Sequence, residues 1–137
     1  MAETLLFQLV SPERMLVEEQ VTEVQIPARE GYIGVLPGHA PLLSELMAGG
    51  VLTYHTSSGP QKVVAVYGGF VEVLPDRVRV LADAAQNKDE INLPAAQAEL
   101  QNANREMYQQ QNSTADPAIV LDEAMRAQAK VDAATKA

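Results

Sequence analysis

The sequence predicts a mainly β protein with an α-helical tail: a β-sandwich or flattened barrel of short strands over residues 1–84, followed by an antiparallel two-helix hairpin over residues 85–137. Up to about Ala82, short segments rich in β-branched residues alternate with turn signals. Beyond that point Ala, Gln, Asn and Glu dominate, and the apolar residues recur at helical spacing. Because 47% of the residues are apolar but only 4% are aromatic, the core must be built from Val, Leu, Ile and Ala.

Seven segments of the first half have the composition of strands, and no helical pattern interrupts them. The second of these segments is long enough for two strands, which we expect to meet at the acidic pair Glu18 and Glu19. In "RVRVLA" the valines share one face and the arginines the other. In the segment before it we place Phe70 inside and Val71 outside. The expected strand segments are 4–10, 14–27, 31–36, 51–56, 61–68, 69–75 and 77–82.

Two helices are predicted in the second half. The first begins at the N-cap Asn92, has Pro94 in its first turn and runs to about Gln110. The second begins at Asp116 and Pro117, a capping carboxylate followed by proline at the first helical position. Each helix has an apolar face with steps of three and four residues. These faces consist of Leu93, Ala96, Leu100, Ala103 and Met107 in the first helix and of Val120, Ala124, Ala127, Val131 and Ala134 in the second.

Because a short polar loop joins the two helices, we expect them to form a helical hairpin. Its apolar faces consist largely of alanine, and burying one methyl-sized group contributes only about 0.8 kcal/mol. The hairpin is therefore expected to be weakly attached to the sandwich and able to leave its resting place.

The net charge of −8 and the absence of cysteine exclude several classes of function. Nucleic-acid binding needs clustered Lys and Arg, and an acidic chain is not attracted to anionic lipid either. Without cysteine there is no disulfide, no thiolate catalysis and no cysteine-based metal site. No apolar run approaches the ~18 residues that span a bilayer, so we expect a cytoplasmic protein that meets a membrane only through its partners.

The segment "EGYIGVLPGHAPLLSEL" (30–46) is the most distinctive stretch of the chain. It is not a Walker-type phosphate loop, because His39 rather than Lys follows its last glycine and its prolines cannot donate N–H groups. His39 and His55 are the two histidines of the chain. No nucleophile pattern accompanies them, which argues against a catalytic base, and no third ligand accompanies them, which argues against a metal site. A rigid docking corner with Glu30 and Tyr32 at its tip fits better, because glycines permit unusual backbone shapes and prolines stiffen them.

The stretches "EGYIGVLPGHAPLLSELMAGGVL" (30–52) and "VYGGFVEVLPDRVRVLAD" (66–83), with "DEINL" opening the hairpin, closely resemble the epsilon subunit of the bacterial F-type ATP synthase. The resemblance covers nearly the whole chain and is strongest over residues 5–83. It implies a non-catalytic central-stalk subunit without cofactor or metal, which turns with the rotor and couples proton translocation through the c-ring to ATP synthesis. It also implies a peripheral position on the cytoplasmic side of the bacterial plasma membrane, within the complex.

The resemblance further implies which residues meet which partner. An extended hairpin is expected to reach the catalytic alpha and beta subunits and to impede ATP hydrolysis, although its basic residues are equally explained as solvated charges on a helix face. The expected c-ring contacts are Glu30, Gly31 and Tyr32; the expected gamma contacts are His39, Ala40, Pro41 and Leu42; and the candidate beta contacts are Arg105, Arg126, Lys130 and Lys136.

Some members of this family bind ATP on the hairpin through an Ile/Leu-Asp-x-x-Arg-Ala pattern. The aligned stretch here is "INLPAA" (91–96), in which Asn92 replaces the Asp and Ala95 replaces the Arg. Because the charged groups that would hold ribose and phosphate are missing, we expect weak or absent ATP binding.

Two other classes of function remain open on the residues alone. A free-standing β-sandwich module that binds carbohydrate needs exposed aromatic side chains, and the chain has four Tyr but no Trp. A small hydrolase would need a catalytic constellation that the sequence does not display.

Overall fold

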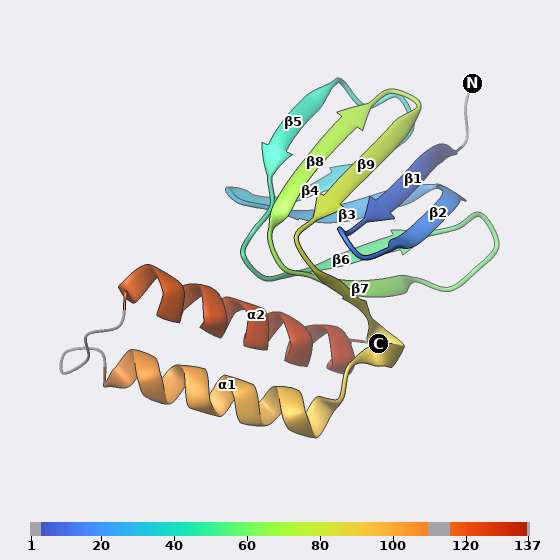
Figure 1. Cartoon of the computed structure of the whole chain (residues 1–137). Helices are drawn as coiled ribbons and strands as arrows, with labels where there is room; N and C mark the ends of the chain where they lie inside the picture. Colours follow the sequence, from blue (N-terminus) through green and yellow to red (C-terminus); the bar gives the residue numbers. More distant parts are fainter. Residues whose placement is uncertain (1–3, 110–115, 137) are drawn as a thin grey trace.

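The computed structural model describes residues 4–109 and 116–136, and its architecture confirms the predicted fold class (Figure 1). Within that range ten strands form a sandwich of two five-stranded sheets, and two helices follow as a hairpin. The elements are β1 (Leu5–Val10), β2 (Met15–Val21), β3 (Glu23–Ala28), β4 (Gly31–Val35), β5 (Leu42–Glu45), β6 (Gly50–His55), β7 (Lys62–Val66), β8 (Gly69–Leu74), β9 (Arg77–Ala82), β10 (Ala85–Asn87), the 3₁₀ turn η1 (Lys88–Glu90), α1 (Leu93–Tyr108) and α2 (Pro117–Thr135).

The first sheet has the order β2-β1-β9-β8-β5, and the second has the order β10-β7-β6-β3-β4. The strand pairs are antiparallel except β1 with β9, which run parallel. Alternate residues of each strand face the other sheet, and the core between them consists mainly of Val, Leu and Ile, as the composition predicts. Its aromatic pair is Phe7 and Tyr54, whose ring centroids are 5.0 Å apart.

The prediction that two strands meet at Glu18 and Glu19 is wrong, because both residues lie within β2. β2 is an edge strand of the first sheet, where acidic side chains reach solvent without breaking the ladder. The break comes at Thr22, where the chain passes from the first sheet to the second. There the Thr22 N–H donates to the His55 carbonyl at 2.8 Å.

The predicted orientation of β8 is also wrong: Val71 is fully buried and Phe70 is 51% exposed. Val71 pairs with the buried Val80 of β9, and paired residues point to the same side of a sheet. Because side chains alternate, Phe70 and the charged Glu72 share the outer face.

Strands β5 and β10 are not among the predicted strands. Both lie at sheet edges, where β5 pairs with β8 and β10 pairs with β7. No side chain of either strand is fully buried, so neither shows the alternation of a half-buried strand. Their pairing partners are distant in sequence, and only the tertiary fold makes them strands.

Both helix starts are confirmed by capping hydrogen bonds. The Asn92 side chain accepts from the Ala95 N–H at 3.1 Å, and the Asp116 carboxylate accepts from the Ala118 N–H at 2.9 Å. α1 ends at Tyr108, and the predicted end near Gln110 lies outside the described residues. The two predicted faces meet, and their fully buried members are Ala96, Ala103, Val120, Ala124 and Ala127.

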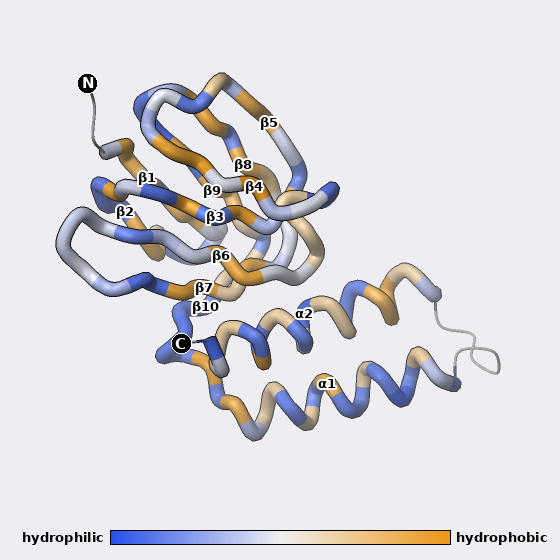
Figure 2. Tube along the Cα trace, turned by 180° about the vertical axis from the view of Figure 1, so that it is seen from behind, coloured by the Kyte–Doolittle hydropathy of each residue, from blue (hydrophilic) through white to orange (hydrophobic). Residues whose placement is uncertain are grey.

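The hairpin covers the outer face of the second sheet, with α2 packed on β6 and β7 and α1 farther away (Figure 1). Ala129 and Ala133 of α2 bury their methyl groups in a cluster with the outward-facing Val51, Val63, Ala65 and Tyr67. In Figure 2 orange runs along several strands, whereas along both helices blue alternates with pale segments and short orange ones. The contact between hairpin and sandwich therefore involves little apolar area on the helical side.

Candidate interaction surfaces

The turn between β3 and β4 has an exposed, charged tip. Arg29 and Glu30 form its two-residue loop, because Ala28 pairs with Gly31 across the hairpin. Gly31 has a φ of 143°, which favours glycine. The Arg29 guanidinium donates to the Glu45 carboxylate at 2.5 Å, and this hydrogen bond raises the pKa of Arg29. An ion pair to β5 thus helps to hold the tip in place.

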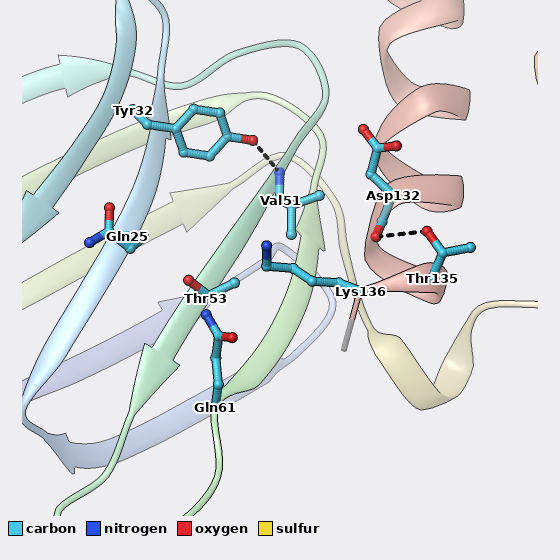
Figure 3. A pocket seen from close by; sticks show the side chains of 8 residues that line it. All are labelled: Gln25, Tyr32, Val51, Thr53, Gln61, Asp132, Thr135 and Lys136. Atoms are coloured by element: carbon cyan, nitrogen blue, oxygen red, sulfur yellow. Dashed lines mark hydrogen bonds between the residues drawn. The ribbon is translucent and has the colours of Figure 1, made fainter.

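Tyr32 is 54% exposed beside this tip, yet its hydroxyl group is turned back onto the sheet (Figure 3). Its oxygen accepts a hydrogen bond from the Val51 N–H at 3.1 Å, across the intervening strand β3. Continuing the β3–β6 register places Pro27 opposite Val51. The Pro27 carbonyl accepts from the Met47 N–H at 2.9 Å. The Tyr32 hydroxyl therefore takes the place of a strand partner for Val51.

The segment between β4 and β5 carries the backbone from the second sheet to the first. Gly38, with a φ of 88°, donates its N–H to the Pro75 carbonyl of the β8–β9 turn at 2.8 Å. The His39 ring Nδ1 lies 2.7 Å from the Ala40 carbonyl oxygen. These contacts give the corner a defined shape. Of the four residues expected to contact gamma, Ala40, Pro41 and Leu42 are exposed on this corner and His39 is partly exposed.

The outer face of the first sheet bears a row of apolar side chains. In the strand registers Phe70 lies opposite Leu81, Leu81 lies beside Val10, and Val10 lies opposite Met15. We call these four residues the apolar row; Phe70, Leu81 and Met15 are each 51% exposed. Single exposed apolar residues are ordinary, whereas a contiguous row indicates an interaction surface. Leu43 of β5 is 73% exposed and lies opposite Glu72 on the same face; Leu42 of β5 and Leu36, which follows β4, are also exposed.

The sequence analysis does not identify this row, because it places Phe70 of β8 in the core and Val71 on the surface, the reverse of what the structure shows. A usable signal was present: Glu72 and Arg79 must face solvent, and strand alternation then places Phe70 and Leu81 on their side.

Lys130 connects three parts of the molecule. Its ammonium group donates to the Glu99 carboxylate of α1 at 2.8 Å and lies 5.6 Å from the centre of the ring of Tyr67, which directly follows β7. Tyr67 in turn donates its hydroxyl hydrogen to Gln86 at 2.6 Å. Burial raises the pKa of Tyr67, so the ring stays neutral and keeps its face available to the cation.

Of the other predicted basic residues, Arg126 lies one helical turn before Lys130 and lines a hollow between the two helices together with it, whereas Arg105 and Lys136 do not line that hollow. Arg105 is exposed in the last turn of α1, and Arg126 is exposed on α2 beside a hollow between that helix and the β5–β6 turn. Lys136 follows the end of α2, and its carbonyl accepts a hydrogen bond from the side chain of Lys88 in η1.

A cavity of about 510 Å³ separates the last turn of α2 from the second sheet (Figure 3). Gln25, Thr53 and Gln61 line it from the sheet, and Asp132 and Lys136 line it from the end of α2. The C-terminal part of the helix thus packs incompletely on the sandwich.

Asn92 and Ala95 bond to each other in the first turn of α1: the Asn92 side-chain oxygen accepts a hydrogen bond from the Ala95 N–H. Neither position provides a charged group toward a nucleotide. Over residues 4–109 and 116–136, no group of three or more His, Cys, Asp or Glu residues is placed to hold a metal ion. In the same range no helix is long and apolar enough to cross a membrane.

The tyrosines do not form a carbohydrate platform. Tyr54 and Tyr67 are buried, at 4% and 6% exposure, and Tyr32 is tied to Val51. Only Tyr108, at the end of α1, is almost fully exposed among the four.

Comparison with known proteins gives consistent matches over the whole chain. The family model described as "ATP synthase, Delta/Epsilon chain, beta-sandwich domain" matches residues 4–88. The ATP synthase epsilon chain of Solibacter usitatus is 49% identical over 136 residues, which is 99% of each chain. That of Koribacter versatilis is 44% identical over 97 residues, 71% of this chain and 67% of the relative.

Two solved structures share the fold. One is a chain in the OSCP/F1/c-ring structure of the Euglena gracilis mitochondrial ATP synthase, with a TM-score of 0.76, 20% identity and coverage of 95% of this chain and 79% of that one. The other comes from the central stalk/c-ring structure of the Tetrahymena thermophila enzyme, with a TM-score of 0.59, 14% identity and coverage of 96% and 94%.

Proposed function

The chain belongs to the family of ATP synthase epsilon chains, and from that premise we propose that it is a non-catalytic subunit of the rotor in the central stalk. In this role residues 1–84 bind the gamma subunit and the c-ring. The sandwich then turns with the rotor and helps to couple proton translocation through the c-ring to ATP synthesis. It carries torque and makes or breaks no covalent bond. The complex places it on the cytoplasmic side of the bacterial plasma membrane.

The observation that carries this proposal is the apolar row on the outer face of the first sheet, together with the exposed Leu43 of β5 on the same face. The described part of the hairpin packs on β6 and β7 of the opposite sheet, and only Phe70 of the row lines a hollow with α2, so most of this face is open to a partner while the hairpin is folded back. We assign it, with His39, Ala40, Pro41 and Leu42 at its border, to the gamma subunit. Large apolar side chains in such a patch provide the anchors of a stable protein interface.

The β3–β4 turn is our candidate for the c-ring contact, through Glu30, Gly31 and Tyr32. Its support is the combination of an exposed charged tip with a backbone held by the Arg29–Glu45 ion pair and the Tyr32–Val51 hydrogen bond. A turn of fixed shape loses little conformational freedom on binding.

Residues 85–137 are proposed to be the regulatory part. The side chains by which the hairpin packs on the second sheet are mainly two alanines and Lys130, so a folded-back state and an extended state can lie within a few kcal/mol of each other. In the extended state the basic residues Arg105, Arg126, Lys130 and Lys136 meet acidic segments of beta, and ATP hydrolysis slows. The residues at positions 92 and 95 predict that ATP does not bind the hairpin tightly.

The test is reconstitution of the purified complex depleted of this subunit. We expect the full chain to assemble in stoichiometric amount with gamma and the c-ring. A chain ending at Ala84 that still assembles should give faster ATP hydrolysis than the full chain. Equal hydrolysis rates would remove the regulatory role, and failure of the full chain to assemble would remove the rotor role.

A further inference from the structure

Two adjacent glycines, Gly49 and Gly50, mark the point where the sandwich meets α2. Both are buried, and neither has a positive φ, so the local backbone conformation does not require glycine at either position. What excludes a side chain is the surroundings, and these differ completely between the two residues.

At Gly49 the obstacle is the hairpin. A Cβ atom built on this residue would lie 2.4 Å from the carbonyl oxygen of Met125, 2.5 Å from its carbonyl carbon and 2.6 Å from the nitrogen of Arg126. All three atoms belong to the backbone of α2, which cannot turn aside as a side chain can. The β5–β6 turn and α2 therefore touch backbone to backbone, and a single methyl group would force the helix away.

At Gly50 the obstacle lies inside the sandwich. A Cβ atom there would lie 2.4 Å from Cβ and 2.8 Å from Cγ of Pro27, on the neighbouring strand β3. Gly50 is thus needed by the sheet itself, whereas the nearest atoms that exclude a side chain at Gly49 belong to the hairpin.

The remaining attachment of the hairpin is too slight to absorb such a displacement. Ala129 and Ala133 contribute only methyl groups to their cluster on the sheet, the partly exposed Lys130 ammonium lies 5.6 Å from the centre of the Tyr67 ring, and the Lys88 side chain donates to the Lys136 carbonyl. A shift of α2 by about one ångström weakens these contacts together, because dispersion falls off steeply with distance.

We propose that the absence of a side chain at Gly49 allows α2 to pack against the sandwich in the folded-back state. Any side chain at this position should then favour the released state and leave the sandwich intact. This inference deepens the proposed regulatory role of the hairpin: it identifies the point on the sandwich that decides between the two states. It concerns the interface between two parts of one chain and is measurable without the complex.

The experiment measures the hairpin position in the isolated full-length chain. Because the chain has no cysteine, nitroxide labels can be attached to cysteines introduced at the exposed Ser58 in the β6–β7 loop and Gln101 on α1. Double electron–electron resonance then gives the distance distribution for the parent chain, Gly49→Ala, Gly49→Leu and the control Gly34→Ala. At Gly34 a Cβ would meet only atoms of the flexible Gln25 side chain, the nearest at 3.0 Å.

We expect at least a tenfold fall in the ratio of folded-back to released molecules in Gly49→Ala, a larger fall in Gly49→Leu, and the parent distribution in Gly34→Ala. Amide hydrogen exchange in the core strands should stay at parent level in both Gly49 variants and should accelerate in Gly50→Ala. Parent-like distances in both Gly49 variants would overturn the proposal. So would loss of core-strand protection in these variants, because the glycine would then serve the sandwich. Failure of the chain to assemble with gamma would refute the rotor role and leave this result standing.

Discussion

The hydroxyl oxygen of Tyr32 accepts a hydrogen bond from the backbone N–H of Val51 at 3.1 Å, reaching across the strand that contains Pro27. Proline at this position of an inner strand supplies no N–H, and its carbonyl is already bonded to the Met47 N–H. A side chain at the proposed c-ring contact thus also completes the sheet beneath it.

Tyr32→Phe should lower the free energy of unfolding by about 1 kcal/mol, because the Val51 N–H loses its acceptor while the ring remains. Urea denaturation measures the stability, and hydrogen exchange of the Val51 amide, which should accelerate, localises the effect. Tyr108→Phe is the matched control, since that tyrosine is 92% exposed. Unchanged exchange at Val51 would show that water replaces the hydroxyl without loss.

The sequence predicts the sandwich, the hairpin and both helix caps because each depends on local signals. Asn92 and Asp116 stand directly before helical spacing, and a cap acts within its own turn. The valines of β9 show which residues share a face. Strand alternation, however, shows which residues share a face and not which face is buried. Only the charge of Glu72 indicates that Phe70, two residues before it, lies on the solvent side, and the prediction for Phe70 is wrong because it does not use that charge.

The candidate surfaces were less predictable, because they arise from residues distant in sequence. The apolar row joins β1, β2, β8 and β9, and only the register of the sheet aligns them. The steric role of Gly49 requires the backbone of α2, about seventy-five residues later in the chain, and no local pattern contains it. The glycines and prolines of residues 30–46 predict a corner with Glu30 and Tyr32 at its tip, whereas no local pattern predicts the Tyr32–Val51 hydrogen bond.

Glu90 should make stability depend on pH through its contact with Arg14. The Arg14 guanidinium donates to both carboxylate oxygens, at 2.7 and 2.9 Å, and with the Asn87 N–H it holds the pKa of Glu90 below its ordinary value. A carboxyl group with a lowered pKa in the folded state adds stability above its unfolded pKa and loses it as the pH falls. Both side chains are more than one third exposed, so the contribution should stay below about 1 kcal/mol.

In urea denaturation at several pH values, Glu90→Gln should therefore be less stable than the parent chain at pH 7. The difference should shrink as the pH falls below the ordinary glutamate value near 4.5 and vanish once Glu90 is protonated in the folded state. Glu13→Gln, which removes an exposed carboxylate near Arg14, controls for net charge. A difference that persists undiminished at the lowest pH would contradict the assignment.

Phe70→Ser should separate binding from folding. The side chain is half exposed in the isolated chain, so the unfolding free energy should fall by only about 1 kcal/mol, roughly half the value of a fully buried phenylalanine. Affinity for the complex depleted of this subunit should fall about thirty-fold, equivalent to about 2 kcal/mol, as for an aromatic anchor of an interface. Ile119→Ser, which removes an apolar side chain of similar exposure on α2, should leave the affinity unchanged. Equal affinities for the two variants would argue against the apolar row as the gamma contact.

Lys130→Met should loosen the folded-back hairpin without unfolding the sandwich. The substitution keeps most of the apolar stem but removes the ammonium group that lies 2.8 Å from Glu99 and 5.6 Å from the centre of the Tyr67 ring. Glu99 belongs to α1 and moves with the hairpin, so the loss that affects docking is the cation–π contact, about 0.5–1 kcal/mol at a partly exposed site. The ratio of folded-back to released molecules should fall about two- to five-fold, measured with the spin-label pair at positions 58 and 101. Lys136→Met removes a charge at the end of the same helix and should change the ratio by less than two-fold. An equal response of both variants would mean that the net charge of the hairpin, and not the contact with Tyr67, holds α2 on the sheet.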